Sequence, residues 1–181
     1  YFVPSKLTAQ DGMEVSLQNF EKVTIDGNVA ATILGTAAAD TLVGDTGADT
    51  ITGRAGADTL TGGSKSDTFI FMTGDTGITE ATADTITDFS TGTDKIDIAT
   101  VGSYVEADGT GTSDLAAFIT AANASLPTTS IDIYAQYNFK GEGNTLVVID
   151  EDKSGAVNTG DTLIILTGLS TAGGLDASDF I

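Results

Sequence analysis

Residues 35–70 decide the fold, because a nine-residue unit repeats there four times: GTAAADTLV (35–43), GDTGADTIT (44–52), GRAGADTLT (53–61) and GGSKSDTFI (62–70). Every unit opens with Gly, carries Asp at position six and Thr at position seven, and has an apolar residue at position eight. A flexible Gly/Asp/Thr-rich linker does not keep an apolar residue in phase. The stretch is therefore a structural repeat.

The period predicts a parallel β-roll. Nine residues are too few for a helical repeat and suit a six-residue turn followed by a three-residue strand. Because neighbouring strand residues point to opposite faces, the eighth residue of each unit should face inward and the Thr residues at positions seven and nine outward. Residues 26–34 fall in the same phase, with Ile33 at the apolar position and Ala31 in place of Asp, which predicts a metal-free coil leading into the roll.

The repeated Asp residues predict calcium sites. Turns of alternate units should stack on the same side of the roll, which brings Asp40 near Asp58 and Asp49 near Asp67. Carboxylates and turn carbonyls together supply the oxygen ligands, about six to eight, that Ca²⁺ takes. The core is a thin ladder of single apolar side chains, so we expect calcium binding and folding to be one event.

These units resemble the RTX nonapeptide, G-G-x-G-x-D-x-U-x, of calcium-binding proteins exported by type I secretion. The resemblance implies Ca²⁺ and the type I secretion machinery as partners, and a secreted, extracellular or cell-surface location. Gly47 and Gly56 match its position four, whereas other units depart from it. The departures at positions two and four, where side chains must accept turn dihedrals that Gly adopts freely, are Thr36, Asp45, Arg54, Ala38 and Lys65.

The segment after the repeats, residues 67–98, resembles the one that follows the last RTX unit in serralysin-type proteases, D-x-F-x-F followed by D-x-I-x-D-F-x-x-G-x-D-x-I-D. The matching residues are Asp67, Phe69, Phe71, Asp84, Ile86, Asp88, Phe89, Gly92, Asp94, Ile96 and Asp97. The resemblance implies that Asp84 and Asp88 complete calcium sites at the end of the roll. The alternative is that these two carboxylates cap turns.

Two further elements are predicted downstream. DEDKSGAVNTGD, residues 150–161, fills an EF-hand-like loop between strands, and predicts a calcium-binding hairpin loop or, alternatively, an ordinary Asp/Gly-rich turn. Its loop positions 1, 3, 5, 6, 9 and 12 are Asp150, Asp152, Ser154, Gly155, Asn158 and Asp161. Residues 113–125 predict one helix with Ser113 as N-cap and Pro127 preventing its extension.

Composition excludes several classes of function. The chain has 7 Lys and Arg against 26 Asp and Glu, a net charge of -19, which disfavours nucleic acid and anionic membranes as partners. It has no Cys and no His, so zinc and histidine-based acid/base chemistry lose their usual groups. Two DTG triplets begin at Asp45 and Asp75, but the first follows Gly44 instead of the apolar strand that aspartic proteases use, and the second lies only 30 residues later. We therefore expect neither an enzyme nor a transmembrane segment.

Together these features predict an all-β protein: a parallel β-roll followed by a β-sandwich-like C-terminal portion with one helix. The expected parts are β-rich lead-in coils (1–34), the calcium roll (35–75) and a capping and secretion-signal region (76–181). The final residues, Asp179 to Ile181, resemble the C-terminus of serralysin-type exported proteins. We expect a structural role with self-assembly, as in an S-layer, adhesin or filament. The alternatives are the C-terminal domain of a secreted hydrolase whose catalytic module lies upstream of Tyr1, and a Thr-rich ice- or surface-binding face.

Overall fold

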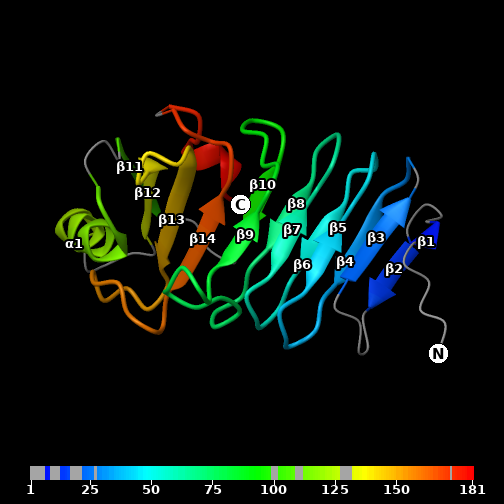
Figure 1. The fold of residues 1–181 in the computed structure, drawn as a ribbon, viewed down its shortest axis with the longest axis horizontal. Helices are drawn as coiled ribbons and strands as arrows, with labels where there is room; N and C mark the ends of the chain where they lie inside the picture. Colours follow the sequence, from blue (N-terminus) through cyan, green and yellow to red (C-terminus); the bar gives the residue numbers. More distant parts are fainter. Residues whose placement is uncertain are drawn as a thin grey trace.

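The computed structural model describes residues 7–8, 13–16, 22–26, 28–98, 102–108, 112–126, 132–171 and 173–181. Within these ranges it has many short strands and one α-helix (Figure 1). The elements are β1 (Leu7–Thr8), β2 (Met13–Ser16), β3 (Lys22–Asp26), β4 (Ala31–Leu34), β5 (Thr41–Val43), β6 (Thr50–Thr52), β7 (Thr59–Thr61), β8 (Thr68–Ile70), β9 (Asp84–Ile86), β10 (Lys95–Asp97), β11 (Ser103–Asp108), α1 (Leu115–Ser125), β12 (Asp132–Phe139), β13 (Asn144–Asp150), β14 (Thr162–Leu166) and the 3₁₀ helix η1 (Ala177–Asp179). No helix in this part of the chain is long and apolar enough to span a bilayer.

The strands form two sheets, and consecutive repeat units alternate between them. One sheet has the order β10-β8-β6-β4-β2, and the other the order β1-β3-β5-β7-β9-β14-β13-β12-β11. All pairs within the roll are parallel, with Thr41 opposite Thr59 and Thr50 opposite Thr68. The predicted all-β fold with a parallel β-roll is confirmed.

The inside of the roll is the ladder that the eighth positions predict. Leu42, Ile51, Leu60 and Phe69 are fully buried, and the residues beside them in each strand are mostly half-buried. Thr52 differs from the expectation, because it is buried where its strand runs into the next turn. The ladder extends in both directions, to Ile33 in β4 as predicted and to Ile86 and Ile96 in β9 and β10.

The C-terminal strands extend one roll sheet. β14 pairs in parallel with β9, then β13 and β12 follow in antiparallel order, and β11 pairs in parallel with β12. The second layer over these strands is α1, because Phe118 and Ala122 pack on apolar side chains of β12, β13 and β14. The C-terminal portion therefore has two layers, one of strands and one formed by the helix, with no separate pair of sheets among the described residues.

The helix begins one residue later than predicted. Asp114 is the N-cap, and its carboxylate accepts the backbone N–H of Ala117 at 2.9 Å. Ser113, the predicted cap, donates its hydroxyl to Asp114 at 3.2 Å instead. The helix ends at Ser125 with Leu126 as C-cap, and Pro127 lies outside the described residues.

The last residues cover the open edge of the five-stranded sheet. Phe180 pairs with Ile96 of β10, and the backbone N–H of Ile181 donates to the Ile96 carbonyl at 3.0 Å. Asp179 is buried, accepts the N–H of Gly92 at 2.8 Å and lies 3.6 Å from the ammonium of Lys95. The division at residues 34 and 75 stays a prediction, and strands on both sides of each boundary share the two roll sheets.

Candidate calcium-binding turns

The Asp residue at position six ends each turn, directly before its strand. These carboxylates are almost completely buried, at 3%, 2%, 1% and 0% exposure for Asp40, Asp49, Asp58 and Asp67. A buried carboxylate is costly unless it is hydrogen-bonded, paired or bound to a metal. The partners of its two oxygens therefore decide what each turn can bind.

On one side of the roll the carboxylates form a ladder of three. The N–H of Asp40 donates to Oδ1 of Asp58 at 2.7 Å, and the N–H of Asp58 donates to Oδ1 of Asp84 at 2.8 Å. Asp40 and Asp58 thus lie together as their spacing indicates. Asp84 takes the next position although it lies 26 residues further along the chain rather than 18.

The other side has a matching ladder. The N–H of Asp49 donates to Oδ1 of Asp67 at 2.8 Å, and the N–H of Asp67 donates to Oδ1 of Asp94 at 3.0 Å. Asp88 reaches the same turn, where it accepts the N–H groups of Gly62 and Gly63 at 3.0 and 2.8 Å. Asp94 was not among the predicted site residues. The sequence feature that could have identified it is Asp94-Lys95-Ile96, which has the Asp-x-apolar pattern of every repeat unit. The turn before it lacks the opening Gly of those units.

Four buried carboxylate oxygens have no hydrogen-bond partner among the described residues: Asp40 Oδ1, Asp58 Oδ2, Asp67 Oδ2 and Asp84 Oδ2. Burial, and to a lesser extent the neighbouring carboxylates, raise the pKa of Asp58 and of Asp67 to about 6 and that of Asp84 to about 8. Unpaired anionic oxygens crowded in a stacked turn are the ligands that a hard cation such as Ca²⁺ prefers. The residues present therefore fit a calcium ion.

The position-four glycines permit the close stacking of turns. A Cβ on Gly47 would stand 2.0 Å from the carbonyl oxygen of Val29, in the preceding coil. Gly56 has a φ of 140°, and a Cβ there would stand 2.8 Å from the carbonyl of Ala38. Among the non-Gly residues at positions two and four, Arg54 and Lys65 adopt positive φ values of 68° and 79°.

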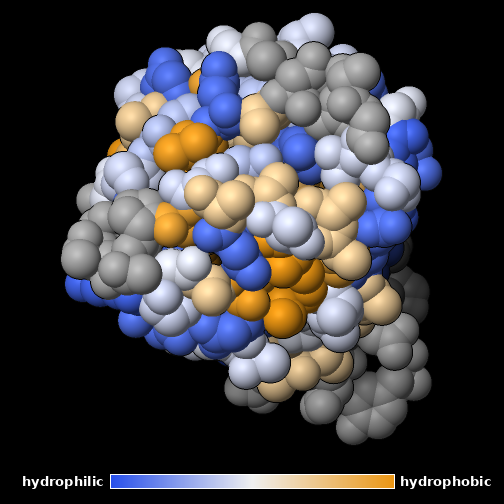
Figure 2. Space-filling model, turned by 90° about the vertical axis from the view of Figure 1, so that its left-hand side faces the viewer, coloured by the Kyte–Doolittle hydropathy of each residue, from blue (hydrophilic) through white to orange (hydrophobic). Residues whose placement is uncertain are grey.

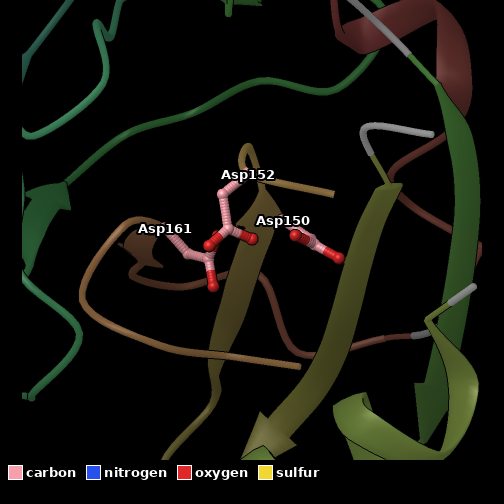
Figure 3. A group of neighbouring side chains, drawn as sticks. All are labelled: Asp150, Asp152 and Asp161. Carbon is pink, nitrogen blue, oxygen red and sulfur yellow. The ribbon is translucent and has the colours of Figure 1, made fainter. Parts of the chain in front are cut away.

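The loop 150–161 gathers its acidic side chains (Figure 3). Oxygens of Asp150, Asp152 and Asp161 lie within 4.8 Å of one another. Gly155 makes the sharp turn with a φ of 70°, and its N–H donates to Asp150 at 2.7 Å. Burial raises the pKa of Asp161 to about 6, whereas hydrogen bonds from Asn158 and Ser154 lower that of Asp152.

Asn158 draws the loop positions together. Its side-chain nitrogen donates to Oδ2 of Asp152 at 2.9 Å, to the hydroxyl of Ser154 at 3.0 Å and to the carbonyl of Ala156 at 3.0 Å. The side chain of Asn158, at loop position 9, therefore holds together the side chains of positions 3 and 5 and the backbone carbonyl of position 7.

The two DTG triplets are not paired. Asp45 belongs to the turn 44–49 on the side of Asp67, whereas Asp75 interacts electrostatically with Asp58 and Asp84 on the opposite side. The Asp75 carboxylate accepts the N–H of Met72 at 3.0 Å. Asp45 and Asp75 thus form no dyad that would share a proton.

Stacked parallel strands with buried Asp turns define the molecule as a calcium-binding β-roll. Residues 34–69 match the family model of the RTX calcium-binding nonapeptide repeat, in four copies. The chain therefore carries four RTX repeats, and such repeats bind Ca²⁺, so the predicted resemblance and the predicted ion are confirmed.

The fold is similar to that of one solved structure in particular. That structure is the solution structure of the AlgE6R3 subunit from the Azotobacter vinelandii mannuronan C5-epimerase, with a TM-score of 0.55 and 21% sequence identity. The match covers 96% of this chain and 80% of that one. No curated protein matches the sequence.

Proposed function

We propose that this chain is a calcium-triggered folding module of a secreted protein, with a structural, surface-assembling role and no catalytic site of its own. The observation that carries the proposal is the set of buried Asp oxygens in the stacked turns that have no partner within the described ranges. At low calcium, their charges and the net charge of -19 oppose compaction. Roughly millimolar external calcium would neutralise them and favour the folded chain.

The loop 150–161 belongs to the same proposal. Asp150, Asp152 and Asp161 supply carboxylates, and Ser154 supplies a hydroxyl oxygen beside Asn158. The loop connects β13 with β14, the strand that joins the C-terminal portion to the roll. A calcium ion held here would therefore stabilise the junction between the two parts.

Assembly is supported by the end of the molecule that carries α1 and β11. β11 is the last strand of its sheet, and edge strands offer free backbone groups to a further strand. Figure 2 shows apolar side chains gathered at this end within a hydrophilic surround. The partly buried apolar residues of β11 and α1 include Val105, Ala107, Leu115 and Ile119. A second copy of the chain is the partner that we propose for this edge.

The second candidate is the C-terminal domain of a secreted enzyme, such as a serralysin-type protease or a lipase. The residues of the segment 67–98 favour it, and the similar solved structure is a subunit of an enzyme. In this case the catalytic residues lie in another part of the protein. The two candidates share calcium-dependent folding and differ in whether copies associate.

The test is a calcium titration of metal-stripped protein, followed by far-UV circular dichroism and light scattering, with Mg²⁺ as control. A calcium-specific gain of β signal with rising scattering is the result we expect. A gain without scattering would favour the enzyme domain. An unchanged spectrum would contradict coupled folding for both candidates.

A further inference from the structure

The four repeat turns are not equivalent. In two of them the residue at position two donates a hydrogen bond to the Asp carboxylate of its own turn, and in the other two no such bond is found among the described residues. In the first unit, Oδ2 of Asp40 accepts the N–H of Thr36 at 2.6 Å and its hydroxyl at 2.9 Å. In the second unit, Oδ2 of Asp49 accepts the N–H of Asp45 at 3.2 Å. These two turns are closed by their own residues.

The third and fourth turns are open. Oδ2 of Asp58 and of Asp67 accepts no hydrogen bond from the described residues, although both side chains are at least 99% buried. Both oxygens point back into their own turns, since a Cβ on Gly53 or Gly62 would stand 2.2 or 2.4 Å from them. Asp40 also has an oxygen without a partner among the residues that the structure describes, but it is Oδ1, which in the other repeat units accepts an N–H from the neighbouring coil.

Backbone conformation explains the difference. Position two has a positive φ in both open turns, 68° at Arg54 and 104° at Gly63, and in neither closed turn. A left-handed residue rotates the adjoining peptide planes, so its N–H no longer reaches the carboxylate. The N–H of Gly63 donates to Asp88 instead, at 2.8 Å.

Each open turn faces a second carboxylate from the segment after the repeats. Oδ2 of Asp84 is buried beside Asp58 and has no partner in the described part of the chain, and a cavity of about 430 Å³ lined by Gly56, Asp75 and Thr76 adjoins this turn. Asp88 reaches the turn that ends at Asp67. Between the turns 35–40 and 53–58, the guanidinium of Arg54 donates to the Gly35 carbonyl at 3.0 Å, so a side chain already bridges them.

We propose that calcium binds at the turns 53–58 and 62–67, with Asp84 and Asp88 as their respective partners, and that the turns 35–40 and 44–49 bind none. Two of the four RTX units are then calcium turns, and the other two are closed without metal. The sequence expectation paired Asp40 with Asp58 and Asp49 with Asp67, one calcium site per pair. The distribution of calcium among turns is independent of the surface role proposed above.

The test compares Asp→Asn variants in matched pairs by calorimetric calcium titration of the metal-stripped full chain. Asp84→Asn and Asp40→Asn each alter one neighbour of Asp58, and Asp88→Asn and Asp49→Asn each alter one group near Asp67. We expect Asp84→Asn and Asp88→Asn each to lose one bound ion or about tenfold in affinity. Asp49→Asn should leave the titration unchanged, because both of its oxygens already accept N–H groups, and Asp40→Asn should lose less than Asp84→Asn. An equal loss in the second set would overturn the proposal.

If a variant fails to fold, a measurement on the unaltered protein still tests the proposal. Anomalous diffraction from crystals grown with Tb³⁺ in place of Ca²⁺ should show peaks beside Oδ2 of Asp58 and of Asp67. Comparable peaks within the turns 35–40 or 44–49 would show that closed turns bind metal, and would refute the assignment.

Discussion

Gly47 shows, at the scale of one residue, how tightly the turns are stacked. Its φ is not positive, so glycine is needed here for space and not for backbone freedom. The carbonyl of Val29 would lie 2.0 Å from a Cβ, and this obstacle is backbone, which cannot move without shifting the coil. The same residue type at position four therefore serves close approach in the second unit and left-handed backbone in the third.

Gly47→Ala should accordingly lower the free energy of unfolding by about 2 kcal/mol or more, because the added methyl overpacks two coils. Thermal or urea unfolding in saturating calcium measures the change. Gly174→Ala is the matched control: its Cβ would stand 3.1 Å from Cδ1 of Leu169, which can rotate away, and 3.3 Å from the carbonyl oxygen of Thr171, well beyond the 2.0 Å found at Gly47. The control should cost about 0.5 kcal/mol or less. Equal losses would mean that the coils are not packed as described.

At the scale of the element, the helix boundary depends on two adjacent capping residues. Ser113 and Asp114 both suit an N-cap, and sequence pattern does not separate neighbours of this kind. The structure selects Asp114, whose carboxylate holds the N–H of Ala117. Asp114→Ala should therefore lower the midpoint of chemical denaturation, and Ser113→Ala should lower it much less. A larger loss of stability in Ser113→Ala than in Asp114→Ala would mean that Ser113 is the N-cap.

The helix also acts as the second layer of the C-terminal portion, through Phe118. This ring is fully buried and lies 5.5 Å from the ring of Tyr134 and 6.3 Å from that of Phe139, measured between centroids. Phe118→Ala should lower the free energy of unfolding by about 3 to 5 kcal/mol, because it leaves a cavity against the sheet. Thr120→Ala, on the exposed face, is the control and should be near neutral in the same unfolding measurement. A near-neutral Phe118→Ala would show that the helix does not cover the sheet.

The elements differ in how far sequence predicted them. The regular nine-residue spacing of Leu42, Ile51, Leu60 and Phe69 located the roll strands. Side chains alternate between the two faces of a strand, so only the middle residue of each three-residue strand points inward. The pairing of β9 with β14 was not predictable in the same way. The strands β12 to β14 are apolar on both faces, and this pattern suits a sheet extended and covered by a helix as well as a sandwich. The sequence also did not distinguish open from closed turns. Arg54 and Thr36 both replace Gly at position two, and only the sign of φ separates them.

For the whole molecule, the raised pKa values predict an unusual dependence on pH. Asp58, Asp67 and Asp84 have folded-state pKa values of about 6, 6 and 8, against 3.8 for an ordinary Asp. Between about pH 4 and pH 8 the folded chain therefore binds more protons than the unfolded chain, and its stability falls as pH rises. The metal-stripped chain should therefore retain more folded structure at pH 5 than at pH 8, as measured by far-UV circular dichroism.

Calcium should reverse this order, because the ion requires deprotonated carboxylates. In saturating calcium the protein should be more stable at pH 8 than at pH 5. Asp84→Asn removes the group with the highest pKa, so it should flatten the metal-free profile between about pH 6 and pH 8. A metal-free stability that rises with pH across the window would contradict the burial of these charges.

The continuous nine-stranded sheet gives the molecule a direction of mechanical weakness. Its strands run across the long axis, and β9 joins the roll to the C-terminal portion by hydrogen bonds to β7 and β14 (Figure 1). A load along the long axis parts these bonds one strand at a time, whereas a load along the strands strains all the bonds of a pair together. The protein should therefore yield lengthwise and resist shear, so tethered copies would withstand most force when pulled parallel to their strands.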